Sequence, residues 1–80
     1  MQSRDILIQN IDKAHTTDMG VARISRNLEI DGDVVEYCKS KILKNESFVN
    51  RKGKNYYVEV DDCIITVNAS SYTIITAHKK

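Results

Sequence analysis

The chain has 80 residues, of which 41% are hydrophobic and 29% charged, with a formal net charge of +1. This length holds one domain with a small core, and the net charge by itself favours no class of partner. No apolar run approaches the roughly 18 residues of a membrane-spanning helix, and no secretory signal opens the chain, so we expect a cytoplasmic protein that does not enter the membrane.

The first half of the chain has helical periodicity. Apolar residues repeat at spacings of three and four, which predicts helices over about 4–14, 18–28 and 32–44. Thr16 or Thr17 is suited to cap the second helix, and Asp31-Gly32-Asp33 ends it and opens the third. Gly20, in the first turn of the second helix, predicts close approach to another backbone.

The second half of the chain alternates between apolar and polar residues. Strands are predicted over about 47–51, 56–60, 63–68 and 72–78, with Gly53 in the first turn. Helices followed by strands favour an α+β fold, a single domain over 1–80 in which three N-terminal helices pack on one face of a four-stranded antiparallel β-meander.

Strand alternation predicts which side chains lie on the uncovered face of the sheet. The last strand divides into Tyr72, Ile74, Thr76 and His78 on one face and Thr73, Ile75 and Ala77 on the other. In the second strand either Tyr56, Val58 and Val60 or their neighbours are buried, and apolar content favours the first choice. The open face then gathers Arg51, Tyr57, Glu59, Thr66, Asn68, Thr76 and His78.

Two isoleucines on this predicted open face have two interpretations. Ile64 and Ile74 there can pair with a second copy, which would make a homodimer. Alternatively the parity is wrong by one residue, which would move Thr76 and His78 into the core and remove the site.

The cysteines indicate neither a metal nor a redox site. Cys38 and Cys63 stand beside core-type neighbours, and the chain has no CxxC or Cys/His ligand spacing. We therefore expect two reduced, buried thiols, no bound metal and no cofactor.

The open-face side chains suit metal-independent cleavage of RNA, as in a small toxin-type ribonuclease. Such a reaction needs a base for the 2′-hydroxyl, an acid for the leaving oxygen and cations for the phosphorane. Glu59 and His78 are the candidate base and acid, with Thr76 beside them and His15 as the other candidate. The candidate substrate-binding residues are Arg51 and Lys54 for the phosphate, Thr66, Asn68 and Thr76 as hydrogen-bond donors, and Tyr57 or Tyr72 for base stacking.

Other interpretations fit the same residues. Between Lys39 and Lys54 six basic residues face one acidic residue, which is typical of a phosphate-binding segment and equally of a solvated surface. A non-catalytic module, such as a phage or mobile-element inhibitor, would use the open face or the basic hairpin to hold a protein or nucleic acid. His15-Thr16-Thr17 also resembles half of the paired HxT motif of phosphoesterases, whose second half is absent here.

Four segments carry a family resemblance. IDKAHTTDMGVARISRNL, DVVEYCKSKI, RKGKNYYVEV and ITVNASSYTIITAHK resemble the small bacterial and phage domains catalogued as domain-of-unknown-function family 3781, over about residues 11–79. More loosely, helices followed by an antiparallel sheet that ends in a TAH strand are similar to the barnase, RelE and colicin-nuclease superfamily. That similarity implies a site on the open sheet face.

Overall fold

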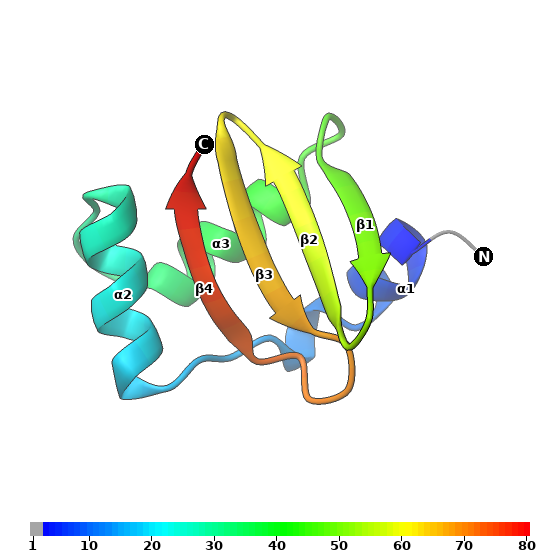
Figure 1. The fold of residues 1–80 in the computed structure, drawn as a ribbon, viewed down its shortest axis with the longest axis horizontal. Helices are drawn as coiled ribbons and strands as arrows, with labels where there is room; N and C mark the ends of the chain where they lie inside the picture. Colours follow the sequence, from blue (N-terminus) through cyan, green and yellow to red (C-terminus); the bar gives the residue numbers. More distant parts are fainter. Residues whose placement is uncertain (1–2) are drawn as a thin grey trace.

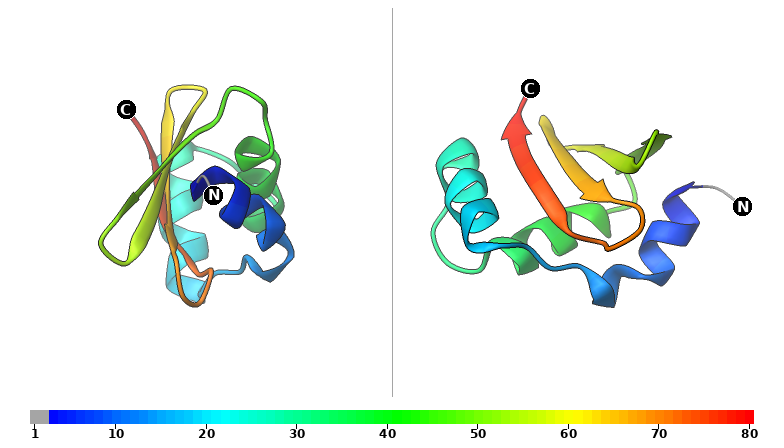
Figure 2. Two further views of the ribbon diagram at one scale, coloured as in Figure 1. Left: turned by 90° about the vertical axis from the view of Figure 1, so that its right-hand side faces the viewer. Right: turned by 60° about the horizontal axis from the view of Figure 1, so that its bottom comes forward.

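Helices cover one face of a single antiparallel sheet. The computed structural model describes residues 3–80. Its elements are α1 (Ser3–Gln9), the short 3-10 helix η1 (Ile11–Lys13), α2 (Asp18–Leu28), α3 (Val34–Ile42), β1 (Phe48–Lys52), β2 (Asn55–Val60), β3 (Cys63–Asn68) and β4 (Ile74–Lys79). The strand order is β1-β2-β3-β4 with antiparallel neighbours (Figure 1), which confirms the α+β meander. Seen nearly edge-on, the sheet has its helices on one side only (Figure 2, left).

The predicted first helix over 4–14 is wrong in its second half. α1 ends at Gln9, and Asn10 leads into η1. The Asn10 side-chain amide donates to the Ile6 carbonyl at 2.9 Å, where a continuing α-helix would place the Asn10 backbone amide. An asparagine that replaces a helical hydrogen bond in this way ends the helix, because it frees the backbone to turn.

The predicted caps of the next two helices are confirmed. Of the two threonines, Thr17 caps α2, and its hydroxyl accepts from the Gly20 amide at 3.1 Å. Asp33 caps α3, and one carboxylate oxygen accepts from the Val35 and Glu36 amides. The Thr16 hydroxyl instead donates to the Ile74 carbonyl at 2.7 Å, so it fastens the start of α2 to β4.

The core lies between the helices and the covered face of the sheet. Its fully buried members include Leu7, Ile24 and Ile42 from the helices and Val58, Ile65, Val67 and Ile74 from the strands. Tyr56 and Val60 are buried with Val58, which confirms the favoured parity of the second strand.

The last strand departs from strict alternation. Ile74 and Ala77 are both fully buried, although residues three apart in a regular strand face opposite sides. Val67 pairs with Ile74 while its neighbour Thr66 pairs with Thr76, so Ile75 is the extra residue of a β-bulge. The predicted open-face position of Ile74 is therefore wrong, whereas Thr76 and His78 stay on the open face.

The buried thiol of Cys38 predicts a loss of stability at alkaline pH. Burial, with a smaller contribution from Cys63, raises the pKa of Cys38 to about 12. An unfolded thiol ionises first, so the free energy of unfolding should fall, by up to about 1.4 kcal/mol per pH unit above about pH 9. Urea unfolding at about pH 8 and about pH 10 measures this loss. The Cys38→Ala variant should lose less over the same interval, and equal losses would contradict the assignment.

Candidate functional site

The strand register arranges the open face in rows across the sheet. One row, which we call the acid-base row, runs Phe48, Glu59, Ile64 and His78, and the next runs Asn50, Tyr57, Thr66 and Thr76. The predicted residues Tyr57, Glu59, Thr66, Thr76 and His78 therefore share one uncovered surface.

Glu59 and His78 flank Ile64 in the acid-base row. Each is paired directly with Ile64, from opposite sides. Two strand spacings separate them, a distance of about 10 Å between backbones. A Glu59 carboxylate oxygen lies 3.2 Å from the Lys80 ammonium, so this predicted base has a cation beside it.

A hollow beside Tyr57 opens on the same face. It is lined by Asn50, Lys52, Gly53, Tyr57, Glu59 and Ile64 and has a volume of ≈ 460 Å³. We call it the Tyr57 hollow. Thr66, in contrast, is only 7% exposed, so its hydroxyl is poorly placed to reach a bound phosphate.

The structure moves Arg51 off the open face. Val49 is the β1 residue that packs against the core, and Arg51, two residues later, shares its side of the sheet. Arg51 is paired with Tyr56, and its guanidinium carbon lies 5.5 Å from the centre of that buried ring. The predicted phosphate-binding arginine is therefore separated from Glu59 and His78 by the sheet.

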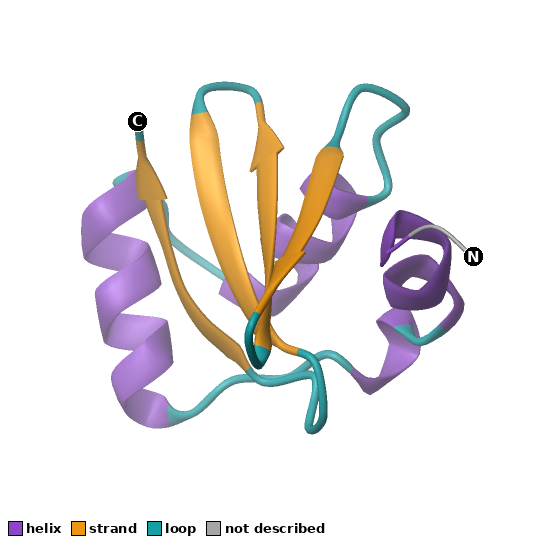
Figure 3. Ribbon diagram, turned by 45° about the vertical axis from the view of Figure 1, so that its right-hand side comes forward, coloured by secondary structure: helices purple, strands orange, loops and turns teal. Residues whose placement is uncertain are grey.

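Arg51 lines a second pocket at the end of the sheet. This hairpin pocket, of ≈ 430 Å³, is lined by Arg51, Lys54, Asn68, Ala69 and Ser70. The β1–β2 hairpin and the β3–β4 turn lie at the same end of the sheet (Figure 3), where the Ala69 amide donates to the Lys54 carbonyl. Three of the predicted substrate-binding residues thus lie together in a pocket away from the open-face rows.

Tyr72 lies outside the rows of the open face. It precedes β4 with a positive φ of 59° and is partly buried against the core. The Lys13 ammonium lies 5.7 Å from the centre of its ring. The predicted strand over 72–78 therefore starts two residues too early.

His15 fastens the segment before α2 to the start of β4. Its Nδ1 lies 2.9 Å from the Lys13 carbonyl, and its Nε2 lies 3.0 Å from the Thr73 hydroxyl. Backbone hydrogen bonds join His15 to Tyr72 and Ile74 on either side of this contact. His78 lies near the other end of β4, so His15 is not part of the acid-base row.

Sequence reasoning missed the serines of the β3–β4 turn. The Asn68 side-chain oxygen accepts from the Ser70 and Ser71 amides, each at 2.9 Å. The Ser71 hydroxyl contacts both Asn68 and Thr73, which continues the contacts to His15. An asparagine followed by serines is typical of such a turn, and this spacing is the signal in the sequence.

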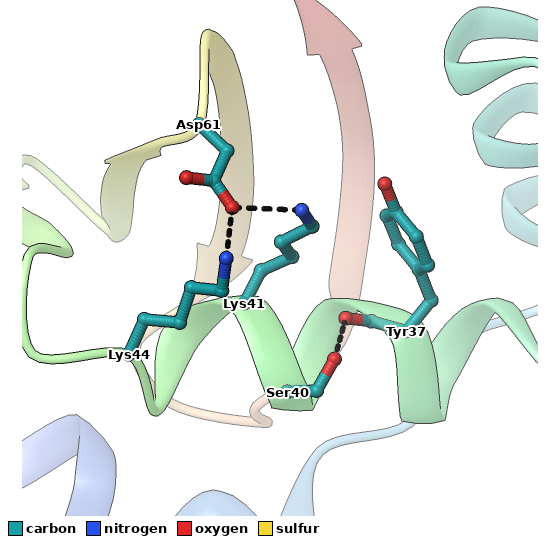
Figure 4. Close-up of polar contacts among 5 residues, drawn as sticks. All are labelled: Tyr37, Ser40, Lys41, Lys44 and Asp61. Atoms are coloured by element: carbon teal, nitrogen blue, oxygen red, sulfur yellow. Dashed lines mark hydrogen bonds and ion pairs between the residues drawn. The ribbon is translucent and has the colours of Figure 1, made fainter.

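The basic segment divides into a neutralised part and an unpaired part. Lys41 of α3 and Lys44, just after the helix, both contact one carboxylate oxygen of Asp61 (Figure 4), and these hydrogen bonds hold the pKa of Asp61 below its usual range. Lys39 is paired with Glu36. Within residues 3–80, no ion pair involves the three cations of the hairpin, Arg51, Lys52 and Lys54.

Of the comparisons with known proteins, the one with protein families matches most of the chain. The model of the family described as "Protein of unknown function (DUF3781)" matches residues 8–78. The chain belongs to the DUF3781 family. No curated protein and no solved structure matches it, so the looser similarity to the barnase, RelE and colicin-nuclease superfamily stays a prediction. In the part of this DUF3781 chain that the structure describes, no helix is long and apolar enough to cross a membrane.

Proposed function

We propose that the protein binds single-stranded RNA across the open face of its sheet. The observation that carries the proposal is the Tyr57 hollow, in which a partly exposed aromatic ring lies beside a lysine without an ion-pair partner in the described chain. A base stacks on Tyr57 while Lys52 attracts the phosphate backbone, which is how proteins hold single strands with little sequence preference. Asn50 is in reach of the edge of the stacked base.

Substitution of Tyr57 tests this binding. Base stacking on one aromatic ring contributes about 1–3 kcal/mol, so Tyr57→Ala should weaken RNA binding by about 5- to 150-fold. Fluorescence anisotropy with a labelled single-stranded oligoribonucleotide at low salt measures it. Tyr57→Phe keeps the ring and should keep the affinity. Equal affinity of Tyr57→Ala and the wild type, or no binding by the wild type, would contradict the proposal.

A second candidate function is cleavage of the bound RNA. The observation that favours it is the placement of Glu59 and His78 on either side of Ile64. Glu59 takes the proton of the 2′-hydroxyl, which attacks the phosphorus, and His78 protonates the departing 5′-oxygen. Lys80, held beside Glu59, stabilises the negative charge that develops on the phosphorane.

Cleavage predicts a loss of activity in two variants. His78→Ala and Glu59→Gln should each lower the rate of RNA cleavage in excess EDTA by about 10²- to 10⁴-fold, the usual contribution of a general acid or base. His15→Ala, which removes the other histidine away from the acid-base row, should retain cleavage. Wild-type protein that cleaves none of a varied set of RNAs would exclude this function while leaving the binding proposal standing.

A further inference from the structure

The hairpin pocket is lined by hydrogen-bond donors. Its polar side chains are a guanidinium, an ammonium, a carboxamide and a hydroxyl, from Arg51, Lys54, Asn68 and Ser70. None of the five residues that line it is acidic. A hollow that presents two positive charges and no carboxylate favours an anion.

The hydrogen bonds already made in the pocket leave several of its donors unused. Among the described residues, Arg51 donates only through Nε, to the Gly53 carbonyl at 2.9 Å, so its two terminal nitrogens remain available to a ligand. The Asn68 oxygen is occupied by the two turn amides, which leaves the amide nitrogen for a ligand. Among the hydrogen bonds and ion pairs of residues 3–80, none engages Lys54 Nζ, Asn68 Nδ2 or the Ser70 hydroxyl.

The two walls of the pocket are held together before any ligand binds. The Ala69 amide donates to the Lys54 carbonyl at 2.8 Å, which ties the β3–β4 turn to the β1–β2 hairpin. The Arg51 guanidinium lies over the buried Tyr56 ring, which limits its motion. Donors on a fixed frame lose less entropy when they bind than donors on flexible chains.

We propose that the hairpin pocket binds a phosphate monoester, the terminal phosphate of an RNA strand. Two cations match a monoester, which carries close to two negative charges at neutral pH, better than an internal diester with one. The guanidinium supplies paired donors to two phosphate oxygens, and the ammonium, amide and hydroxyl supply donors to the third.

The choice of RNA as the bearer of this phosphate rests on the proposed function. Gly53 lines the Tyr57 hollow and Lys54, the next residue, lines the hairpin pocket. A strand stacked on Tyr57 therefore reaches the pocket by passing the tip of the β1–β2 hairpin. The terminal phosphate can belong to the 5′ or the 3′ end, and the experiment separates the two.

The test uses three forms of one short oligoribonucleotide. The first carries a 5′-phosphate, the second a 3′-phosphate and the third no terminal phosphate. Anisotropy of the wild-type protein should show one phosphorylated form bound about tenfold or more tightly than the unphosphorylated form, as hydrogen bonds to charged groups allow. In Arg51→Ala and Lys54→Ala this preference should disappear. Lys52→Ala is the matched control, because it removes a neighbouring charge on the other face of the hairpin. It should weaken binding of all three RNAs by the same factor and keep the preference.

The outcomes separate this inference from the proposed function. Equal binding of all three RNAs by the wild type would overturn the phosphate site and leave RNA binding intact. A preference that survives in both Arg51→Ala and Lys54→Ala would also overturn it. Binding of none of the RNAs would overturn the proposed function, and the terminal-phosphate assignment with it.

Discussion

Replacement of Ile74 with alanine should lower the free energy of unfolding by about 2–5 kcal/mol. The side chain is fully buried in the core, beside the bulge that turns it inward from β4. Truncation leaves a cavity between the sheet and the helices, and a closely packed interior collapses only in part to fill it. Urea unfolding followed by circular dichroism measures the loss.

The adjacent isoleucine is the matched control. Ile75 is the extra residue of the bulge and is 37% exposed, so Ile75→Ala should cost less than about 1 kcal/mol. Strict alternation would give the reverse order, with Ile75 buried beside Ala77. A larger loss for Ile75→Ala than for Ile74→Ala would therefore refute the bulge, while Thr76 and His78 would keep their place opposite Ala77.

Patterns within one element were predictable from the sequence. The caps at Thr17 and Asp33 and the buried face of the second strand depend on neighbours a few residues apart, and the structure confirms them. The bulge in β4 was not predictable in this way, because it depends on how Val67 and Thr66 pair with another strand. A strand's own sequence shows the period of two but not the residue at which the period is interrupted.

The sequence predicted which residues belong to the candidate site. It did not predict which of them lie together on the open face and which lie in the hairpin pocket. Glu59, Thr76 and His78 share the open face as expected, because Glu59 alternates with buried residues of β2 and Thr76 and His78 flank the buried Ala77 of β4. β1 has only Val49 partly buried, so its pattern was too weak to place Arg51. That arginine joins Lys54 in the hairpin pocket because the hairpin meets the β3–β4 turn, a contact between segments distant in the sequence.

The structure also separates the basic residues that are paired with carboxylates from those that are not. The lysines in α3 and just after it neutralise Asp61 and Glu36, so they contribute to the fold rather than to an anion site. The hairpin cations have no such partner within residues 3–80. In the sequence, both sets belong to one basic segment between Lys39 and Lys54. Recognition of an anion is therefore expected at the hairpin, where the positive charge is not already balanced.

Gly20→Ala should also destabilise the protein, by about 1–3 kcal/mol. Glycine usually lowers the stability of a helix relative to alanine. At an ordinary position in α2, glycine to alanine would therefore raise the free energy of unfolding. Here a Cβ atom at position 20 would lie 2.0 Å from the Thr16 hydroxyl oxygen. The close contact predicted for Gly20 is present, but Gly20 approaches the Thr16 side chain and not another backbone segment. Thr16 can relieve the overlap only by rotating, which breaks its hydrogen bond to the Ile74 carbonyl.

A double-mutant cycle isolates that cause. Thr16→Ala removes the hydroxyl and leaves its Cβ 3.3 Å from the new methyl group, a tight contact that small shifts relieve. In this background Gly20→Ala should cost close to nothing, because the gain in helix propensity offsets the remaining crowding. Urea unfolding of the two single variants and the double variant gives the coupling energy. The same loss from Gly20→Ala in both backgrounds would show that Thr16 is not what keeps position 20 a glycine.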